Sequence, residues 1–361
     1  MLNSTFLVAL TAARLVAAPG APVADPGIAP PRTPTTTRAP VRVVATLPVY
    51  AEIAREIGGT EVQVVAIADP AEDAHFVRPK PSFALEIRRA DAFITTGLDL
   101  ELWVPALLSK AGNARVGPGA PGHIIAHTGI TLLDVPSSVD RAAGDIHIYG
   151  NPHIYTDPLN AIQIARNIAE GLKRVAPDRA AAFDRGLAAF TDQIHRRLFG
   201  DRLVDMLQGE TLERLARSGK LFSFLSSQAY EGKPLTQYLG GWLAAAEPFR
   251  GKKIICYHKD WAYFEQRFDV TCAEYVEAKP GIPPTPGHVA RLIRMMQDQG
   301  IRVLLSPNYY DRSKSEVVTD RVGGTAVIVP MQPGGDTGVQ TYFDLVDTWV
   351  TSLANAFRQS S

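Results

Sequence analysis

The sequence lacks an excess of charge, has very few cysteines, and offers no apolar segment long enough to cross a membrane. Lysine and arginine together number 37, as do aspartate and glutamate, so the formal net charge is zero. Nucleic-acid-binding proteins usually carry a basic excess, and its absence argues against a nucleic-acid partner. No apolar run reaches the roughly 18 residues that a membrane helix needs. The balanced charge says nothing for or against a small ligand, and the hydrophobic content of 46% with 20% charged residues is typical of a globular protein.

Cysteine is restricted to Cys256 and Cys272. In an oxidising compartment the two could form a disulfide. They could equally be two buried thiols on neighbouring strands, because spacing in the sequence does not reveal their geometry. With no cysteine near the N-terminus, we expect no lipid attached there.

Residues 1–41 are expected to be an export signal followed by a tether. The apolar, alanine-rich run from Phe6 to Ala18 resembles the core and cleavage zone of an export signal. No lysine or arginine precedes this run, and Arg14 interrupts it. The proline-, alanine- and threonine-rich residues up to Pro40 bury little apolar surface, which is typical of a disordered or polyproline-like tether. We therefore expect an exported protein, periplasmic or otherwise extracytoplasmic.

The rest of the chain predicts two α/β lobes joined by one long helix. Short β-branched segments alternate with helical patterns in 42–176 and again in 200–361, which predicts in each lobe a mostly parallel sheet flanked by helices. Between the lobes, residues 177–199 contain apolar residues at steps of three or four and only one glycine, Gly186. A helix of this length would span about 35 Å and couple the lobes stiffly.

Three histidines fall beside predicted strand ends or helix starts: His75, His153 and His258. In open α/β sheets the loops beyond the strand carboxyl ends form the ligand crevice, so three such loops could converge between the lobes. Neutral imidazole is a common ligand of zinc and similar ions. Asp311, just past another predicted strand, is the best candidate for a fourth ligand. Tyr310 and Glu316 are weaker candidates.

A single histidine in a loop is more often a surface or capping residue than a ligand. We interpret four of the remaining histidines in that way, namely His123, His127, His195 and His288. The exception is His147, which is close enough in sequence to His153 to contact a metal ligand or to be a weak ligand itself.

Several stretches together resemble the metal-binding solute receptors of zinc and manganese ABC importers. "EDAHFVRPKPS" is similar to that family's first-ligand loop, "NPHIYTDPLNA" to its second, and "YHKDWAYF" to its third. "ATLPVYAEIAREIGGTEVQVVAI" resembles the opening of the family, and "KPGIPPTPGHVARLI" its later helix. The resemblance extends from Val41 to Phe357.

The resemblance implies that His75, His153 and His258 are metal ligands and that Asp311 is the fourth. It also implies a rigid helix between the lobes, modest loop movements on metal capture, and delivery of the metal by a monomer to a membrane permease. Two departures from the family pattern stand out. Ala74 replaces a usual proline, and the acidic, histidine-rich loop of many zinc receptors is absent.

The predicted donors favour zinc. Three imidazoles and one carboxylate suit Zn²⁺ better than Mn²⁺, which prefers more oxygen ligands, so Mn²⁺ is the alternative. A zinc hydrolase would need an open coordination position and a general base, and the sequence has no H-E-x-x-H motif. We therefore expect no enzyme. An adhesin is a third hypothesis, and only the proline-rich tether favours it.

Overall fold

The computed structural model describes residues 38–136, 147–277 and 282–359. The chain divides into two units, Met1–Arg38 and Ala39–Ser361, and the second unit contains all the helices and strands discussed below. The predicted export signal and nearly all of the predicted tether fall outside the described residues. Within the described ranges, no helix is long and apolar enough to cross a membrane.

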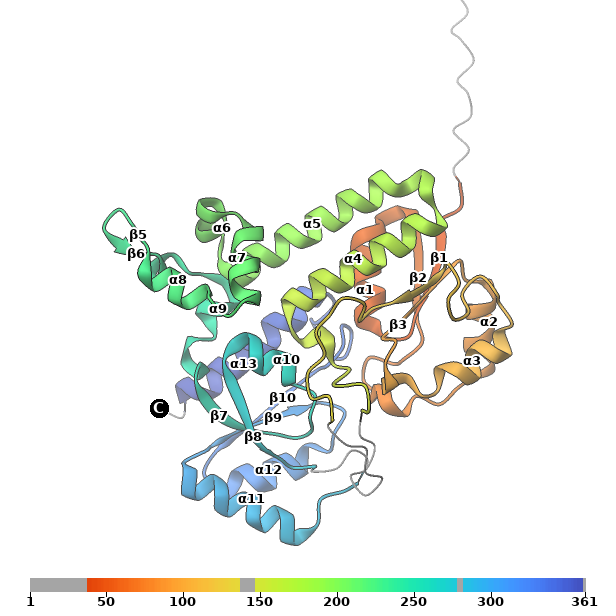
Figure 1. The fold of residues 1–361 in the computed structure, drawn as a ribbon. Coiled ribbons are helices and arrows are strands. Elements are labelled where there is room, and N and C mark those ends of the chain that lie inside the picture. The colour runs from red at the N-terminus through yellow and green to blue at the C-terminus, as the bar shows by residue number, and fades with distance from the viewer. Residues whose placement is uncertain (1–37, 137–146, 278–281, 360–361) are drawn as a thin grey trace, which may run out of the picture. The chain divides into compact units, whose positions relative to one another are not determined.

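The N-terminal lobe is built on a parallel four-stranded sheet in the order β2-β1-β3-β4 (Figure 1). Apart from Arg42, its central strands β1 and β3 consist of β-branched and other apolar residues, because helices cover both faces of the sheet. Helices α1 and α4 pack together, as do α2 and α3. The strands are β1 (Val41–Ala45), β2 (Val62–Ala66), β3 (Ala92–Thr95) and β4 (His123–Ile125). The helices are α1 (Pro48–Gly58), α2 (Pro81–Arg89), α3 (Val104–Ala111) and α4 (Pro158–Val175).

The C-terminal lobe repeats the pattern with the strand order β10-β9-β7-β8, again parallel. A separate apolar cluster, which includes Ile255, Leu292 and Val318, joins two of the helices, α11 and α12, to one face of this sheet. The strands are β7 (Lys252–Cys256), β8 (Val270–Tyr275), β9 (Val303–Pro307) and β10 (Thr325–Val329). The helices are α10 (Ala262–Phe268), α11 (Pro286–Gln299), α12 (Arg312–Asp320) and α13 (Tyr342–Gln359).

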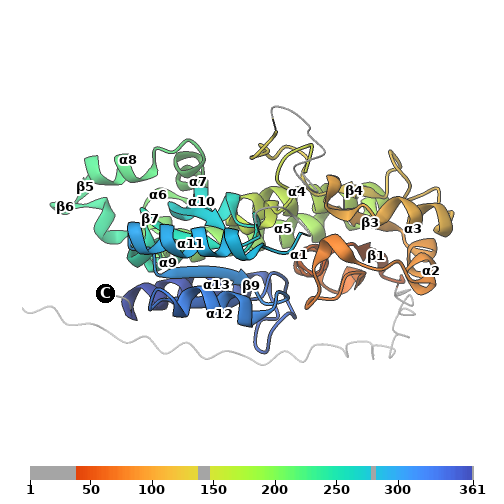
Figure 2. The same ribbon diagram turned by 90° about the horizontal axis from the view of Figure 1, so that it is seen from below.

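The predicted connecting helix is α5 (Ala180–Phe199), which packs against α1 and α4 of the first lobe and against α7 and α9 near the second. Figure 2 shows α5 close to α4 and α1. The single glycine of this helix has a packing role, because a Cβ at Gly186 would lie 2.1 Å from the carbonyl oxygen of Ile57 in α1. The predicted fold class is confirmed, while the lobe boundaries at residues 176 and 200 stay predictions.

A group of short elements follows α5 and precedes β7. It contains a two-residue hairpin whose turn is formed by Glu231 and Gly232, both with positive φ. The helices are α6 (Asp201–Leu207), α7 (Gly209–Arg217), α8 (Leu221–Ser227) and α9 (Gly241–Ala245), and the hairpin strands are β5 (Ala229–Tyr230) and β6 (Lys233–Pro234).

A buried ion pair and a disulfide hold the region around the lobe junction. Asp157 caps the start of α4, and both its oxygens accept hydrogen bonds of 2.8 Å from Arg267 of α10. Cys256 and Cys272 form a disulfide that joins β7 to β8. The first connection involves α4, which follows His153 in the chain, and the second involves β7, which ends two residues before His258.

Candidate metal centre

The structure brings the three predicted histidines together. His75 lies in a 3-10 turn after β2, His153 precedes the short turn that leads into α4, and His258 comes two residues after β7. The ring centroid of His75 is 5.3 Å from that of His153 and 6.0 Å from that of His258. Loops far apart in the sequence therefore meet at one point, as the arrangement of strand ends predicts.

A fourth imidazole belongs to the same cluster. The Nε2 atom of His147 lies 3.1 Å from Nε2 of His75, and its ring centroid lies 5.9 Å from that of His153. Two nitrogens bound to one tetrahedral zinc ion are separated by about 3.3 Å. His147 is therefore placed where a ligand could be, although its position in the sequence was only a weak indication of such a role.

Asp260 is a carboxylate of the site that the sequence analysis did not identify. It is fully buried, and among the described residues neither of its oxygens has a hydrogen-bond partner. Its Oδ1 lies 3.2 Å from Nε2 of His153. Burial raises the pKa of Asp260 to about 8. The residue lies two positions after His258 in the stretch "YHKDWAYF", so the sequence contained a signal for it.

Asp311 does not join the cluster, contrary to what the sequence suggested. Its side chain is exposed and caps the start of α12, where Oδ1 accepts hydrogen bonds from the backbone N–H and the hydroxyl of Ser313. The two weaker candidates are also engaged elsewhere. Tyr310 stacks on Tyr257 at 4.1 Å between ring centroids, and Glu316 forms an exposed ion pair with Arg312.

The inner nitrogens of three histidines are oriented by hydrogen bonds at their outer nitrogens. In each case Nδ1 donates to an oxygen acceptor, so that the unprotonated Nε2 faces the cluster. Asn151 is oriented in turn, because its oxygen also accepts the backbone N–H of His153. The bonds are His75 to Asp73 at 2.6 Å, His147 to Asp99 at 2.9 Å and His153 to Asn151 at 2.9 Å.

This orientation creates two pairs of facing acceptors. The Nε2 atoms of His75 and His147 lie 3.1 Å apart, and Nε2 of His153 lies 3.2 Å from a carboxylate oxygen of Asp260. Two acceptors at such distances repel each other unless a positive charge lies between them. A proton can supply that charge in the metal-free protein, and a bound divalent cation can supply it as well.

The pKa values of the histidines differ in a way that suits metal binding. Burial and the charge of His75 lower the pKa of His258 to about 3, and burial holds the pKa of His153 well below its usual value. Burial alone would lower the pKa of His75 as well. The hydrogen bond to Asp73 and the negative charge of Asp73 outweigh burial, and the pKa of His75 is raised. His153 and His258 are therefore neutral at pH 7, as ligand nitrogens must be.

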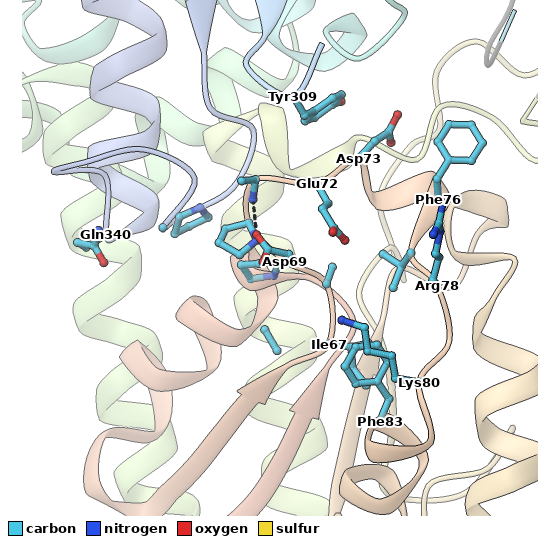
Figure 3. A pocket seen from close by; sticks show the side chains of 18 of the residues that line it. Ile67, Asp69, Glu72, Asp73, Phe76, Arg78, Lys80, Phe83, Tyr309 and Gln340 are labelled. Carbon is cyan, nitrogen blue, oxygen red and sulfur yellow. Dashed lines mark hydrogen bonds between the residues drawn. The ribbon is translucent and has the colours of Figure 1, made fainter. Parts of the chain in front are cut away.

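A pocket of about 970 Å³ lies beside the cluster, between the segment after β2 and the second lobe. Figure 3 shows Glu72 and Lys80 extending into this pocket, with Tyr309 on its far side. Glu72, Asp73 and Tyr309 also line the small cavity that contains His75 and His153. These three residues thus lie between the pocket and the histidine cluster.

The remaining histidines each contact a protein group away from the cluster. His195, buried on α5, is paired with Glu213 of α7 at 2.9 Å, and His288 contacts the carbonyl of Tyr275 at 2.8 Å. His123 contacts the hydroxyl of Thr95, and His127 the carbonyl of Thr96.

A model of the ZnuA family, described as the periplasmic component A of a zinc-uptake complex, matches residues 43–197 and 235–356. The chain belongs to this family. The residues between the two matched segments hold α6, α7, α8 and the β5–β6 hairpin. The predicted family resemblance is confirmed, and the chain is a metal-binding receptor of the ABC-importer type rather than an enzyme.

Individual relatives agree with the family but differ in their metals. The iron-binding protein YfeA of Yersinia pestis is 24% identical over 329 residues, which cover 90% of this chain and 89% of that protein. The zinc-binding lipoprotein AdcA of Streptococcus pneumoniae is 25% identical over 152 residues, 41% of this chain and 29% of its own length. The manganese ABC transporter substrate-binding lipoprotein PsaA of the same species is 23% identical over 162 residues, 45% of this chain and 50% of its own.

Solved structures of ZnuA-type proteins share the fold. A crystal structure of ZnuA has a TM-score of 0.64 at 19% identity and covers 88% of this chain and 99% of that chain. The Mn-bound periplasmic metal-binding protein of Candidatus Liberibacter asiaticus has a TM-score of 0.61 at 16% identity, with 88% and 99% covered. At these identities the likeness concerns the fold alone.

Proposed function

We propose that this protein captures Zn²⁺ outside the cytoplasm and delivers it to the permease of an ABC importer. The proposed ligands are His75, His153, His258 and Asp260, with His147 as a neighbouring weaker donor. The observation that carries the proposal is the close approach of acceptor atoms, at 3.1 Å between His75 and His147 and at 3.2 Å between His153 and Asp260. A divalent cation would relieve both close approaches.

The donor set supports zinc over the metals named for the relatives. Imidazole nitrogens outnumber carboxylate oxygens in the cluster, whereas Mn²⁺ prefers sites rich in oxygen. Fe²⁺ accepts imidazole as well, but a given nitrogen site generally binds it more weakly than Zn²⁺. Manganese remains the alternative cargo, and iron, named for YfeA, is another.

Delivery implies a location and a partner. The export-like N-terminal sequence and the family membership support an extracytoplasmic protein that meets its permease at the membrane. We propose that it acts as a monomer, and neither the balanced charge nor the family favours a nucleic-acid partner.

Calorimetric titration of the metal-free protein with Zn²⁺, Mn²⁺ and Fe²⁺ tests this proposal. We expect one tight zinc site, lost in His153→Ala and His258→Ala and weakened less in His147→Ala. His288→Ala, on α11 and outside the cluster, is the matched control and should bind zinc as the unchanged protein does. Zinc binding that survives the cluster substitutions would contradict the proposed ligands, and tighter binding of another metal would contradict the proposed cargo.

A further inference from the structure

Helices α11 and α12 enclose a groove of about 790 Å³ on the C-terminal lobe. Both helices cover the same face of the β10-β9-β7-β8 sheet (Figure 1). Apolar side chains line the groove, notably Val289 and Ile293 of α11 and Val317 of α12. Val317 is 54% exposed, which is high for a valine in the middle of a helix.

All the charged residues that line the groove are cations: Arg294, Lys314 and Arg321. None of the three takes part in an ion pair with another of the described residues. No acidic residue of the same two helices is among the residues that line the groove. Glu316 pairs with Arg312, and Asp311, which caps α12, is exposed and feels the charge of Lys314.

We propose that this groove docks an acidic, amphipathic helix of a partner protein. Its apolar lining matches the apolar side chains that such a helix presents on one face, and its three cations match flanking carboxylates. The flanking α12 has nine residues and is therefore about 13 Å long, so about two to three turns of a partner helix would fit. The partner chemistry follows from the excess of positive charge within a groove of an otherwise neutral chain.

A bilayer is a poorer occupant than a helix. The apolar residues lie in a concave groove between two helices, where a flat lipid surface makes little contact. Membrane-binding surfaces instead project their apolar side chains into the interface. The groove lies outside the proposed metal site, so docking and zinc binding can be tested separately.

The test uses the full chain and a fluorescent synthetic peptide of about 12 residues, with leucines at i, i+3, i+4 and i+7 and glutamates elsewhere. We expect the peptide to bind and its affinity to fall as salt is raised. Arg294→Glu and Lys314→Glu should each weaken binding by about tenfold or more, because they place like charges opposite the peptide. Arg291→Glu is the matched control, since Arg291 is exposed on α11 but does not line the groove.

Zinc titration of the same variants should give unchanged affinity, which shows that they are folded. The proposal is overturned if a peptide with lysines in place of the glutamates binds equally well, or if Arg291→Glu weakens binding as much as Arg294→Glu. It is also overturned if the acidic peptide does not bind while vesicles of phosphatidylglycerol do, or if the groove variants instead abolish self-association of the chain.

Discussion

The carboxylate of Asp260 approaches Nε2 of His153 to 3.2 Å, and no described group donates a hydrogen bond to it. Both atoms can only accept when Asp260 is ionised. A buried carboxylate without a donor is costly, and a bound cation offsets that cost. The proposed site therefore has Asp260 as its carboxylate ligand, whereas the site expected from the sequence had Asp311.

Replacing each aspartate with asparagine separates the two sites. Asp260→Asn should weaken zinc binding by at least the 10- to 100-fold that follows loss of an outer hydrogen-bond partner of a metal ligand. Asp311→Asn should leave zinc affinity unchanged, because asparagine caps a helix about as well as aspartate. Calorimetric titration measures both, and the reverse result would restore Asp311 as the ligand.

Zinc binding should release a proton from Asp260. Because its pKa is raised to about 8, this carboxyl is mostly protonated at pH 7 in the metal-free protein and must ionise to bind a cation. Titrations in buffers of different ionisation enthalpy count the protons released. We expect the unchanged protein to release close to one proton more than Asp260→Asn at pH 7, and equal counts would argue against Asp260 as a ligand.

The fall of zinc affinity in acid should be governed by His75. Among the three predicted histidine ligands its pKa alone is raised, so below the range in which Asp260 titrates protons compete with zinc at His75 first, whereas His153 and His258, with lowered pKa values, stay neutral to lower pH. Asp73→Asn removes the charge that raises the pKa of His75. The variant should bind zinc about 10- to 100-fold more weakly at neutral pH, but its affinity should begin to fall only at a lower pH.

Competition with a chromophoric chelator between about pH 5.5 and 8 records this profile, a range that spans the ordinary imidazole pKa. Asp91→Asn, a change at a half-buried aspartate in the same lobe and away from the cluster, serves as the control. A profile that does not move in Asp73→Asn would mean that another group controls the competition.

The disulfide should contribute to stability. Cys256 and Cys272 are 16 residues apart, and closing a loop of this size stabilises a folded chain by about 3 kcal/mol in the chain-entropy account. The double change to alanine should lower the free energy of unfolding in urea by about that amount. Reduction of the unchanged protein should give the same loss, and adding a reductant should then have no effect on the double variant.

Arg267 and Asp157 should be strongly coupled. Arg267→Leu leaves the buried carboxylate of Asp157 without its partner, which costs about 3–5 kcal/mol. Adding Asp157→Asn should recover part of this loss, since asparagine keeps the cap of α4 and removes the uncompensated charge. Urea unfolding of both single variants and the double variant measures the coupling, and additive losses would show that the pair is not coupled.

Much of the fold was predictable because the residue pattern of each segment favours the same secondary structure that the packed fold requires. The alternation of β-branched strands with helices determines parallel sheets, and the apolar spacing in 177–199 identified the helix that became α5. The histidines were predictable for the same reason, since each follows a strand or precedes a helix. Gly186 was visible in the sequence, but its close approach to Ile57 depends on how α1 and α5 pack.

The remaining parts of the site depend on short-range geometry. Asp311 directly precedes a helix, where aspartate commonly caps the free N–H groups, and this competing role takes its side chain away. Asp260 lies two residues before α10, and the backbone conformation of this loop determines whether its side chain faces the histidine cluster. The pairing of the two cysteines likewise depends on the arrangement of β7 and β8, which the sequence spacing leaves open.

The helix α5, held against α1 without room for even a methyl group at Gly186, has a kinetic consequence. Because α5 also packs against α7 and α9, a receptor built around this helix would exchange its cargo by replacing one ligand at a time rather than by swinging open. Release would then be slow in free solution, and the transporter itself would have to speed it up. The metal would then be released mainly when the receptor binds the transporter, and little would dissociate before that.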